Sequence, residues 1–590
     1  EEQKIESGAA ISSVIPNIMA LAESYPDLKA NQNFMNLSNQ LEAVEEDIAN
    51  SRKYYNGTVK RYNMSVQTIQ TKTRVEKGKS SIASVIFGRT GIIILLILLQ
   101  FGFLIAGYTY LQGKMYFIDS VVKAGAVILV IYLTNNRSNP AFKMVWMTIM
   151  LVAPVFGVLL YIFVEFQVGV RWLNARLEHM HETTKKHWTQ DEAVQEQLKE
   201  EDSEVASLAH YVCEYGGFPA YENTGVKYFS CGEDKIEELI RQLEKAEKFI
   251  FMEYFIVAKG YVWDRVLEVL KRKAAEGVEV RFMYDGTCTV SLLPPNYPKK
   301  LEQEGIACRV FSPIRPALST HQNNRDHRKI VVIDGKVAFT GGINLADEYV
   351  NRKIRFGHWK DTAIMLEGDA VRSFTLMFLE MWNVAKSEKV EEFDPYLDVI
   401  YEREKHSGEG FVIPYGDSPI DGEHVGKMVY MDILNTSKRY VHIMTPYLIL
   451  DNEMMTALKF AAKRGVEVII IMPHVPDKWY AFVLAKTYYN ELLDAGVQIY
   501  EYTPGFVHAK VFTSDDRKAV VGTINMDYRS LYLHFECAAF LYENSEIPAV
   551  ENDFQETLKK CQKITQEDYK KQKSFDKIAG SILRVFAPLM

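Results

Sequence analysis

Two stretches of the chain share one pattern: residues 327–344 read HRKIVVIDGKVAFTGGIN, and residues 508–525 read HAKVFTSDDRKAVVGTIN. Each has a lysine two residues after a histidine, an aspartate five residues after that lysine, and an asparagine at its end. Alternate side chains of a β-strand share a face, so the histidine and lysine of each copy are expected to point into one cleft. One such pattern is a weak signal, but two copies with the same spacing predict a duplicated functional unit.

The duplication extends upstream of both copies. Residues 246–285 and residues 437–473 each read as a strand, an amphipathic helix with a basic end, the tetrapeptide Gly-Val-Glu-Val and a second strand. From about residue 225 onward, short apolar strands alternate with amphipathic helices, which is typical of α/β domains. The sequence therefore predicts an α/β fold built from two similar halves.

The paired motifs supply the side chains that phosphodiester chemistry requires. One histidine can attack phosphorus while the other protonates the leaving alkoxide, and the two lysines can neutralise the charge on the phosphate oxygens without a metal. The order of the two histidines is left open, because the two copies are symmetric. The candidate catalytic residues are His327, Lys329, Asp334, His508, Lys510 and Asp515. Asp334 precedes a glycine, so a hairpin turn is an alternative role for it and the one we favour.

Four further polar residues are candidates for the same cleft. Asn344 and Asn525 end the two motifs and are expected to face the phosphate oxygens. Each histidine is also expected to need an orienting carboxylate, and Asp361 and Glu536 follow their motifs at similar distances. Which carboxylate serves which histidine is left open. For Glu536, a strand residue paired with a neighbour is the alternative interpretation.

The region before the repeat predicts a membrane anchor. Residues 90–111 and 144–166 are apolar enough for spanning helices, the second with Pro154 tolerated inside it. Residues 116–134 are either a third span or a re-entrant or interfacial segment. Basic residues at 74–89 place the N-terminal flank inside, so three spans would put the chain after residue 166 outside the cytoplasm. Arg171 and Arg176 argue against that topology.

The length, charge and cysteine content of the chain argue against some classes of function. The chain has 590 residues, which favours several domains, and a formal net charge of −8, which does not favour a nucleic-acid binder. Its six cysteines form no CxxC pair, so we expect neither a zinc site nor a disulfide framework.

Beyond these motifs, the chain resembles the phospholipase D superfamily and, within it, the bacterial cardiolipin synthases, over residues 85–590. The resemblance rests on RDHRKIVVIDGKVAFTGGINLADEY (325–349), TPYLILDNEM (445–454), GFVHAKVFTSD (505–515), NMDYRSLYLHFE (525–536) and the terminal LRVFAPLM (583–590). Residues 1–70 resemble part of the LemA family. A departure is Lys360, where the family usually has arginine.

The resemblance implies a fold and a domain order. We expect two phospholipase D-like α/β/α sandwich domains related by pseudo-two-fold symmetry, so that both motifs meet in one cleft. The expected order is a LemA-like helical segment (1–70), a transmembrane region (85–170), a charged helical linker (171–210), a first domain (211–390) and a second domain (391–590).

It also implies a bacterial cell-membrane enzyme without a cofactor. The expected reaction joins two phosphatidylglycerol molecules into cardiolipin and glycerol through a phosphohistidine, with His327 as nucleophile and His508 as general acid and base. The alternatives are a phospholipase D, another phosphatidyltransferase such as a phosphatidylserine synthase, and, in another class, a non-catalytic membrane scaffold. Phosphatidylglycerol, cardiolipin and the bilayer are the expected partners, and nucleic acid is not.

Overall fold

A computed structural model describes most of the chain after residue 115. The described residues are 98–99, 101–103, 105–107, 109–110, 116–136, 139–165, 168–294, 296–314, 323–385, 393–397 and 409–589. They all belong to one compact unit, Ile93–Met590. The LemA-like segment, the basic stretch 74–89 and much of the predicted span 90–111 lie outside the described residues.

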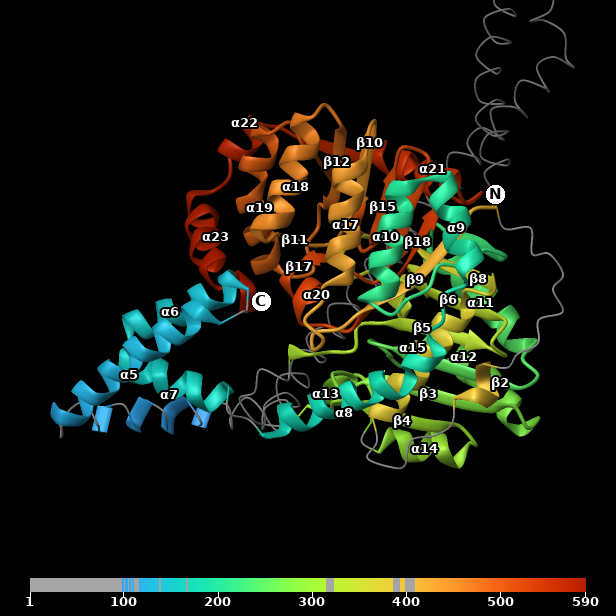
Figure 1. Cartoon of the computed structure of the whole chain (residues 1–590), viewed down its shortest axis with the longest axis horizontal. Helices are drawn as coiled ribbons and strands as arrows, with labels where there is room; N and C mark the ends of the chain where they lie inside the picture. Colours follow the sequence, from blue (N-terminus) through green and yellow to red (C-terminus); the bar gives the residue numbers. More distant parts are fainter. Residues whose placement is uncertain are drawn as a thin grey trace, which may run out of the picture. The chain divides into compact units, whose positions relative to one another are not determined.

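The first half of the repeat forms a seven-stranded mixed sheet in the order β1-β8-β6-β5-β2-β3-β4 (Figure 1). Its strands are β1 (Thr224–Phe229), β2 (Phe249–Tyr254), β3 (Glu279–Asp285), β4 (Ala307–Phe311), β5 (Lys329–Ile333), β6 (Val337–Gly341) and β8 (Ala363–Gly368). Strands β2, β3 and β4 run parallel, and β5 joins β2 in antiparallel register. Its helices are α11 (Gly232–Glu244), α12 (Tyr261–Ala275), α13 (Cys288–Ser291), α14 (Tyr297–Gln303), η3 (Asp347–Val350), α15 (Val371–Val384) and α16 (Asp394–Leu397).

The second half forms an eight-stranded sheet in the order β19-β13-β12-β10-β15-β16-β18-β9. Its strands are β9 (Phe411–Asp417), β10 (Tyr440–Met444), β12 (Glu467–Pro473), β13 (Gln498–Tyr502), β15 (Val511–Ser514), β16 (Lys518–Gly522), β18 (Glu536–Tyr542) and β19 (Cys561–Ile564). Its helices are α17 (Val425–Thr436), α18 (Asn452–Lys463), α19 (Trp479–Asp494), α20 (Tyr528–Tyr532), α21 (Ile547–Leu558), α22 (Gln566–Lys570), α23 (Ser574–Phe586) and η4 (Ala587–Leu589). Read from β9 inward, this strand order repeats that of the first sheet, with β19 as an added edge. The predicted α/β fold of two similar halves is confirmed.

Both sheets are buried on both faces, which explains their continuous apolar strands. In β2, Ile250 and Met252 pack with α11 and α12, while Phe249 and Phe251 point the other way. That other face belongs to a core shared by both sheets, by α15 and by α21. Helices α17, α18 and α19 cover the outer face of the second sheet. Side-chain alternation thus assigns each strand residue to an outer core or to the shared one.

Short backbone pairings join the two halves beside the motifs. Strand β7 (His358–Lys360) of the first half pairs in parallel with β14 (Gly505–Val507) of the second. A further parallel bridge links Asp326 to Phe535. A two-stranded sheet of β11 (Leu448–Ile449) and β17 (Met526–Asp527) lies within the second half. The segments that carry His327 and His508 are therefore each held by backbone from the opposite half.

The predicted span 144–166 is wrong as a single helix. The chain forms α6 (Pro140–Val152) and α7 (Pro154–Glu165), and the backbone leaves helical geometry at Ala153. Pro154 opens α7 because a proline lacks the N–H that would continue α6. Trp146 of α6 lies against Tyr161 of α7 with ring centroids 5.3 Å apart, so the two helices fold back on one another. Gly157 permits this, since a Cβ there would lie 2.8 Å from the Cα of Met150.

The segment 116–134 forms α5 (Tyr116–Asn135), which packs against α6 and α7. Among the described residues, no helix combines the length and the apolar character needed to cross a membrane.

The predicted charged linker is helical and partly buried. It comprises α8 (Val168–Thr184), η1 (Lys185–His187), α9 (Glu192–Glu201) and α10 (Ser203–Glu214). Leu198, Val205 and Ala209 are fully buried in the core beneath α17. Apolar positions on α9 and α10 therefore attach this region to the second half.

Candidate active site

His327 lies two residues before the first strand of one hairpin, and His508 lies three residues before the first strand of the other. Lys329 begins β5, and Lys510 directly precedes β15. Each lysine therefore lies where the chain enters the sheet, two residues after its histidine. Asp334 and Gly335 turn between β5 and β6 with positive φ angles of 54° and 68°. Asp515 and its successor occupy the same conformation in the second hairpin. Two successive positive φ angles are typical of tight hairpin turns, as predicted for Asp334.

The two motif aspartates bind backbone. The Asp334 carboxylate accepts N–H groups of Glu247, Lys248 and Phe249 at 2.7–2.8 Å. Asp515 accepts the equivalent amides of residues 438–440 at 2.7–3.0 Å. Each aspartate thus fixes its hairpin to the start of the neighbouring strand. These contacts favour the structural role over the catalytic role for which both residues were candidates.

Each histidine takes its carboxylate from the other half. His327 Nδ1 lies 2.8 Å from Glu536 Oε2, and His508 Nδ1 lies 2.7 Å from Asp361 Oδ2. The backbone of each histidine also contacts the opposite half. The His327 N–H donates to the carbonyl of Phe535, the residue before Glu536, at 2.9 Å. The His508 N–H donates in the same way to the residue before Asp361, at 2.7 Å. The pairing that the sequence left open is therefore crossed.

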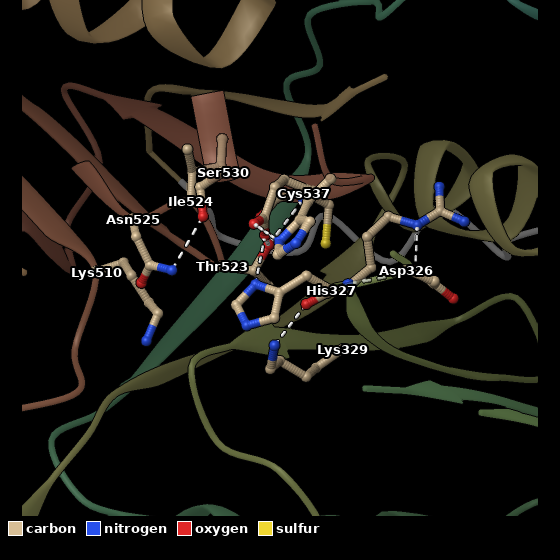
Figure 2. A network of polar contacts seen from close by, with 12 residues as sticks. Asp326, His327, Lys329, Lys510, Thr523, Ile524, Asn525, Ser530 and Cys537 are labelled. Carbon is tan, nitrogen blue, oxygen red and sulfur yellow. Dashed lines mark hydrogen bonds and ion pairs between the residues drawn. The ribbon is translucent and has the colours of Figure 1, made fainter. Parts of the chain in front are cut away.

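The lysines are buried beside their own histidines. Lys329 Nζ donates to the carbonyl of His327, and Lys510 Nζ donates to the carbonyl of His508; Figure 2 shows the first of these contacts. Burial lowers the pKa of Lys329 to about 8, against the attraction of Glu536. Burial also lowers the pKa of Lys510 to about 7, against the attraction of Asp361 and helped by the charge of Lys329.

Both imidazoles are neutral near pH 7. Burial lowers the pKa of His327 to about 3 and that of His508 to about 4, although Glu536 and Asp361 oppose the shifts. Because Nδ1 of each ring faces a carboxylate, it carries the proton and leaves the Nε2 lone pair free. Lys329 lowers the pKa of both histidines, so the two half-sites lie within electrostatic reach of each other.

The two asparagines differ in whether their side-chain oxygen accepts a hydrogen bond. Asn344 accepts the N–H of Ile256 at 2.9 Å and donates to the Tyr349 hydroxyl at 2.8 Å. Asn525 donates to the Ser530 hydroxyl at 3.0 Å (Figure 2), and its side-chain oxygen has no partner among the described residues. Asn525 therefore keeps an unused acceptor, whereas the amide oxygen of Asn344 is already occupied.

Three side chains that contact the carboxylates were not predicted. The Thr523 hydroxyl donates to Glu536 Oε2. The Trp359 indole N–H lies 3.4 Å from Asp361 Oδ2, and His534 Nδ1 lies 3.6 Å from Glu536 Oε1. Trp359 and His534 each stand two residues before their carboxylate. That shared spacing was the signal in the sequence.

One group of side chains has the donor set of a metal site. The ligand atoms of His327, His534 and Glu536 lie within 4.8 Å of one another, and all three residues are buried. Two imidazole nitrogens and a carboxylate suit Zn²⁺. The positive charge of Lys329 beside His327 disfavours a cation there.

Comparison with known proteins places these features in a family. The family described as "Cardiolipin synthase, PLD-like domain" matches residues 239–382 and 430–558. Residues 124–164 match the family described as "Phospholipase_D-nuclease N-terminal", and residues 1–79 match the LemA family.

Individual relatives cover most of the chain. An uncharacterized protein of Streptococcus mutans is 52% identical over 78% of this chain and 99% of its own length. A cardiolipin synthase of Geobacillus kaustophilus is 34% identical over 81% of this chain and 95% of its own length. Among solved structures, the phosphatidylserine synthase of Haemophilus influenzae has a TM-score of 0.48 and 13% identity, and covers 62% of this chain and 93% of its own.

The duplicated sheet and the paired His-x-Lys half-sites define a phosphatidyltransferase of the phospholipase D superfamily. Within that superfamily, the chain belongs to the family of the cardiolipin synthases and their phospholipase D-like relatives, with a LemA-like region at its N-terminal end.

Proposed function

We propose that this protein is a cardiolipin synthase that transfers a phosphatidyl group from one phosphatidylglycerol to another. The observation that carries the proposal is the crossed pair of histidine–carboxylate contacts, which leaves one free Nε2 in each half-site. Two such nitrogens suit a double displacement at phosphorus. Relatives named cardiolipin synthase, 32–34% identical over most of the chain, support the choice of acceptor.

In the first step, Nε2 of His327 attacks the phosphorus of phosphatidylglycerol and the bond to glycerol breaks. His508 gives its proton to the departing alkoxide, so glycerol leaves as a neutral alcohol. Both imidazoles are neutral near pH 7, and the negative charge of a bound phosphodiester raises the pKa of His508 toward the protonated form that this step needs.

In the second step, neutral His508 takes the proton from a hydroxyl of a second phosphatidylglycerol. The resulting oxygen attacks phosphorus, the P–N bond to His327 breaks, and cardiolipin is released. Lys329 and Lys510 neutralise the charge that develops on the non-bridging oxygens, and the second N–H of the Asn525 amide, beside the one given to Ser530, can donate to one of them. The assignment of His327 as nucleophile follows the family resemblance.

Incubation of the purified protein with phosphatidylglycerol tests the proposal. We expect cardiolipin and free glycerol in equal amounts. Phosphatidic acid as the sole product would instead identify a phospholipase D, and a serine-dependent product would identify a phosphatidylserine synthase. A protein that converts no phospholipid would support the non-catalytic scaffold.

We also propose that the enzyme works at the bacterial cell membrane. The match of residues 124–164 to the N-terminal region of the family supports this location. So does helix α23, which exposes Phe575, Ile578 and Ile582 by 59–70%. Large apolar side chains exposed along one helix are typical of a lipid interface.

A further inference from the structure

Each half-site combines a histidine, a lysine and a carboxylate from the opposite half, and the ring beside each carboxylate differs between the two. Trp359 stands two residues before Asp361, and its ring lies 5.1 Å from that of His508 between centroids. His534 stands two residues before Glu536, and its ring lies 5.5 Å from that of His327. An indole N–H can only donate, whereas a neutral imidazole has one nitrogen that donates and one that accepts. The ring beside Glu536 therefore offers a different set of hydrogen-bonding atoms from the ring beside Asp361.

His534 is buried without its hydrogen bonds. It is 8% exposed, and among the described residues neither of its ring nitrogens has a hydrogen-bond partner. Glu536 Oε1 is also buried and unpartnered, although Oε2 binds His327 and Thr523. Buried polar groups are rarely left unpaired in folded proteins, because each costs free energy.

The two unpartnered atoms face each other. His534 Nδ1 lies 3.6 Å from Glu536 Oε1, and a hydrogen bond of about 2.8 Å needs a shift of less than about 1 Å. In the other half-site the indole of Trp359 already contacts Asp361. Closing the gap gives Glu536 a donor on each oxygen and fixes its orientation toward His327.

We propose that His534 is a positioning residue for His327, acting through the free oxygen of Glu536. Its effect on turnover rests on the proposed phosphatidyl transfer. The charged or titratable groups that interact with His534 include Glu536, His327 and Asp527. A hydrogen bond from His534 to Glu536 Oε1 holds Oε2 of the same carboxylate toward His327 Nδ1.

The first test measures turnover of phosphatidylglycerol by the full chain between pH 5 and 9. We expect His534→Leu, which lacks a donor, to lower kcat about tenfold while KM changes little. His534→Gln keeps a donor, so it restores kcat at pH 8 to within about threefold of the natural protein. The mirror variant Trp359→Phe removes the N–H that lies 3.4 Å from Asp361 Oδ2 and lowers kcat through the other half-site.

The second test needs no turnover. In full-length protein labelled with ¹⁵N at histidine, the proton between His327 Nδ1 and Glu536 gives a low-field resonance. We expect that resonance to shift in His534→Leu, which lacks the donor, and to return toward its natural position in His534→Gln. If it behaves in this way while the natural protein forms no cardiolipin, the positioning role stands and the proposed function fails.

Three results would overturn the proposal. The first is an unchanged resonance and an unchanged kcat in both His534 variants. The second is loss of thermal stability in both variants with kcat preserved, which would make His534 a purely structural residue. The third is inhibition by micromolar Zn²⁺ that His534→Gln abolishes, which would assign the three-residue group to a metal.

Discussion

Removing the charge of Glu536 tests the crossed arrangement most directly. Glu536→Gln keeps the shape of the side chain but replaces a fully buried carboxylate that lies 2.8 Å from His327 Nδ1. A hydrogen bond to a charged group contributes about 1.5–3 kcal/mol, which corresponds to about 10- to 150-fold in rate. The glutamine amide also donates toward Nδ1, which moves the imidazole proton to Nε2 and blocks attack. In a serine protease triad the comparable change costs about 10⁴-fold, so we expect kcat to fall by about 10²- to 10⁴-fold.

The assay separates the two half-sites by the leaving group. A phosphatidyl ester of p-nitrophenol needs little protonation when it leaves, so loss of the general acid matters less for its first step. Asp361→Asn acts on His508, and we expect its defect to shrink on this substrate when release of p-nitrophenol is followed. Glu536→Gln acts on His327, and its defect should persist.

The opposite pattern, rescue of Glu536→Gln but not of Asp361→Asn, would reverse the assignment of nucleophile and general acid. Near-normal turnover in both variants would refute the reasoning. A matched control is Glu551→Gln, because Glu551 forms a similar contact with His442 at 2.9 Å elsewhere in the second half. That variant should retain full activity.

Three further predictions follow from the geometry. The affinity for sulfate, which remains a dianion from pH 6 to pH 9, should fall with rising pH in calorimetry. Binding needs protonated Lys510, whose pKa is lowered to about 7, so affinity is full below that pH and is lost above it by up to about tenfold per unit. Gly342→Ala should lower kcat about 100-fold, because its Cβ would lie 2.0 Å from Asp361 Oδ1 and displace the carboxylate from His508. The side chains of Ile578 and Ile582 on α23 are both exposed and apolar. The double variant Ile578→Asp/Ile582→Asp should therefore lower the turnover of phosphatidylglycerol in vesicles more than the turnover of a short-chain analogue in detergent.

Each of these has a control or a contrary result. Constant sulfate affinity across the pH range would contradict the role given to the lysine. Gly225→Ala meets only ordinary contacts, the nearest at 3.7 Å, and should be active. Ser581→Asp adds a charge to α23 without removing an apolar side chain, so an equal loss of vesicle activity there would argue against burial of the isoleucines in lipid.

The sequence predicts the repeat, the α/β class and the hairpin turns, because these depend on local spacing. Alternate side chains of a strand share a face, which places His327 and Lys329 on the same side. Asp334 is followed by a glycine, which indicates a hairpin turn. The crossed carboxylates could not be predicted, since the contact of His327 with Glu536 depends on how the two halves pack. His534 was missed because it lies outside the duplicated motif, although its spacing from Glu536 was visible.

The predicted transmembrane region shows a second limit of sequence reasoning. Hydropathy measures only how apolar a segment is, so 144–166 read as one helix. The break at Ala153 and the close approach of Gly157 to Met150 depend on tertiary contact between the two short helices. A proline inside an apolar run is compatible with a kinked helix or with a new one, and here it begins a new one.

Because each histidine takes its carboxylate from the opposite half, neither half contains a complete histidine–carboxylate pair. A separated half would keep its histidine and lysine but lose the group that holds the imidazole proton on Nδ1. Two inactive fragments produced together should therefore complement each other, whereas either fragment alone should not. An ancestor with one copy of the unit would have needed a second identical subunit to supply the carboxylate. Tandem fusion of two copies would have placed both carboxylates in one chain.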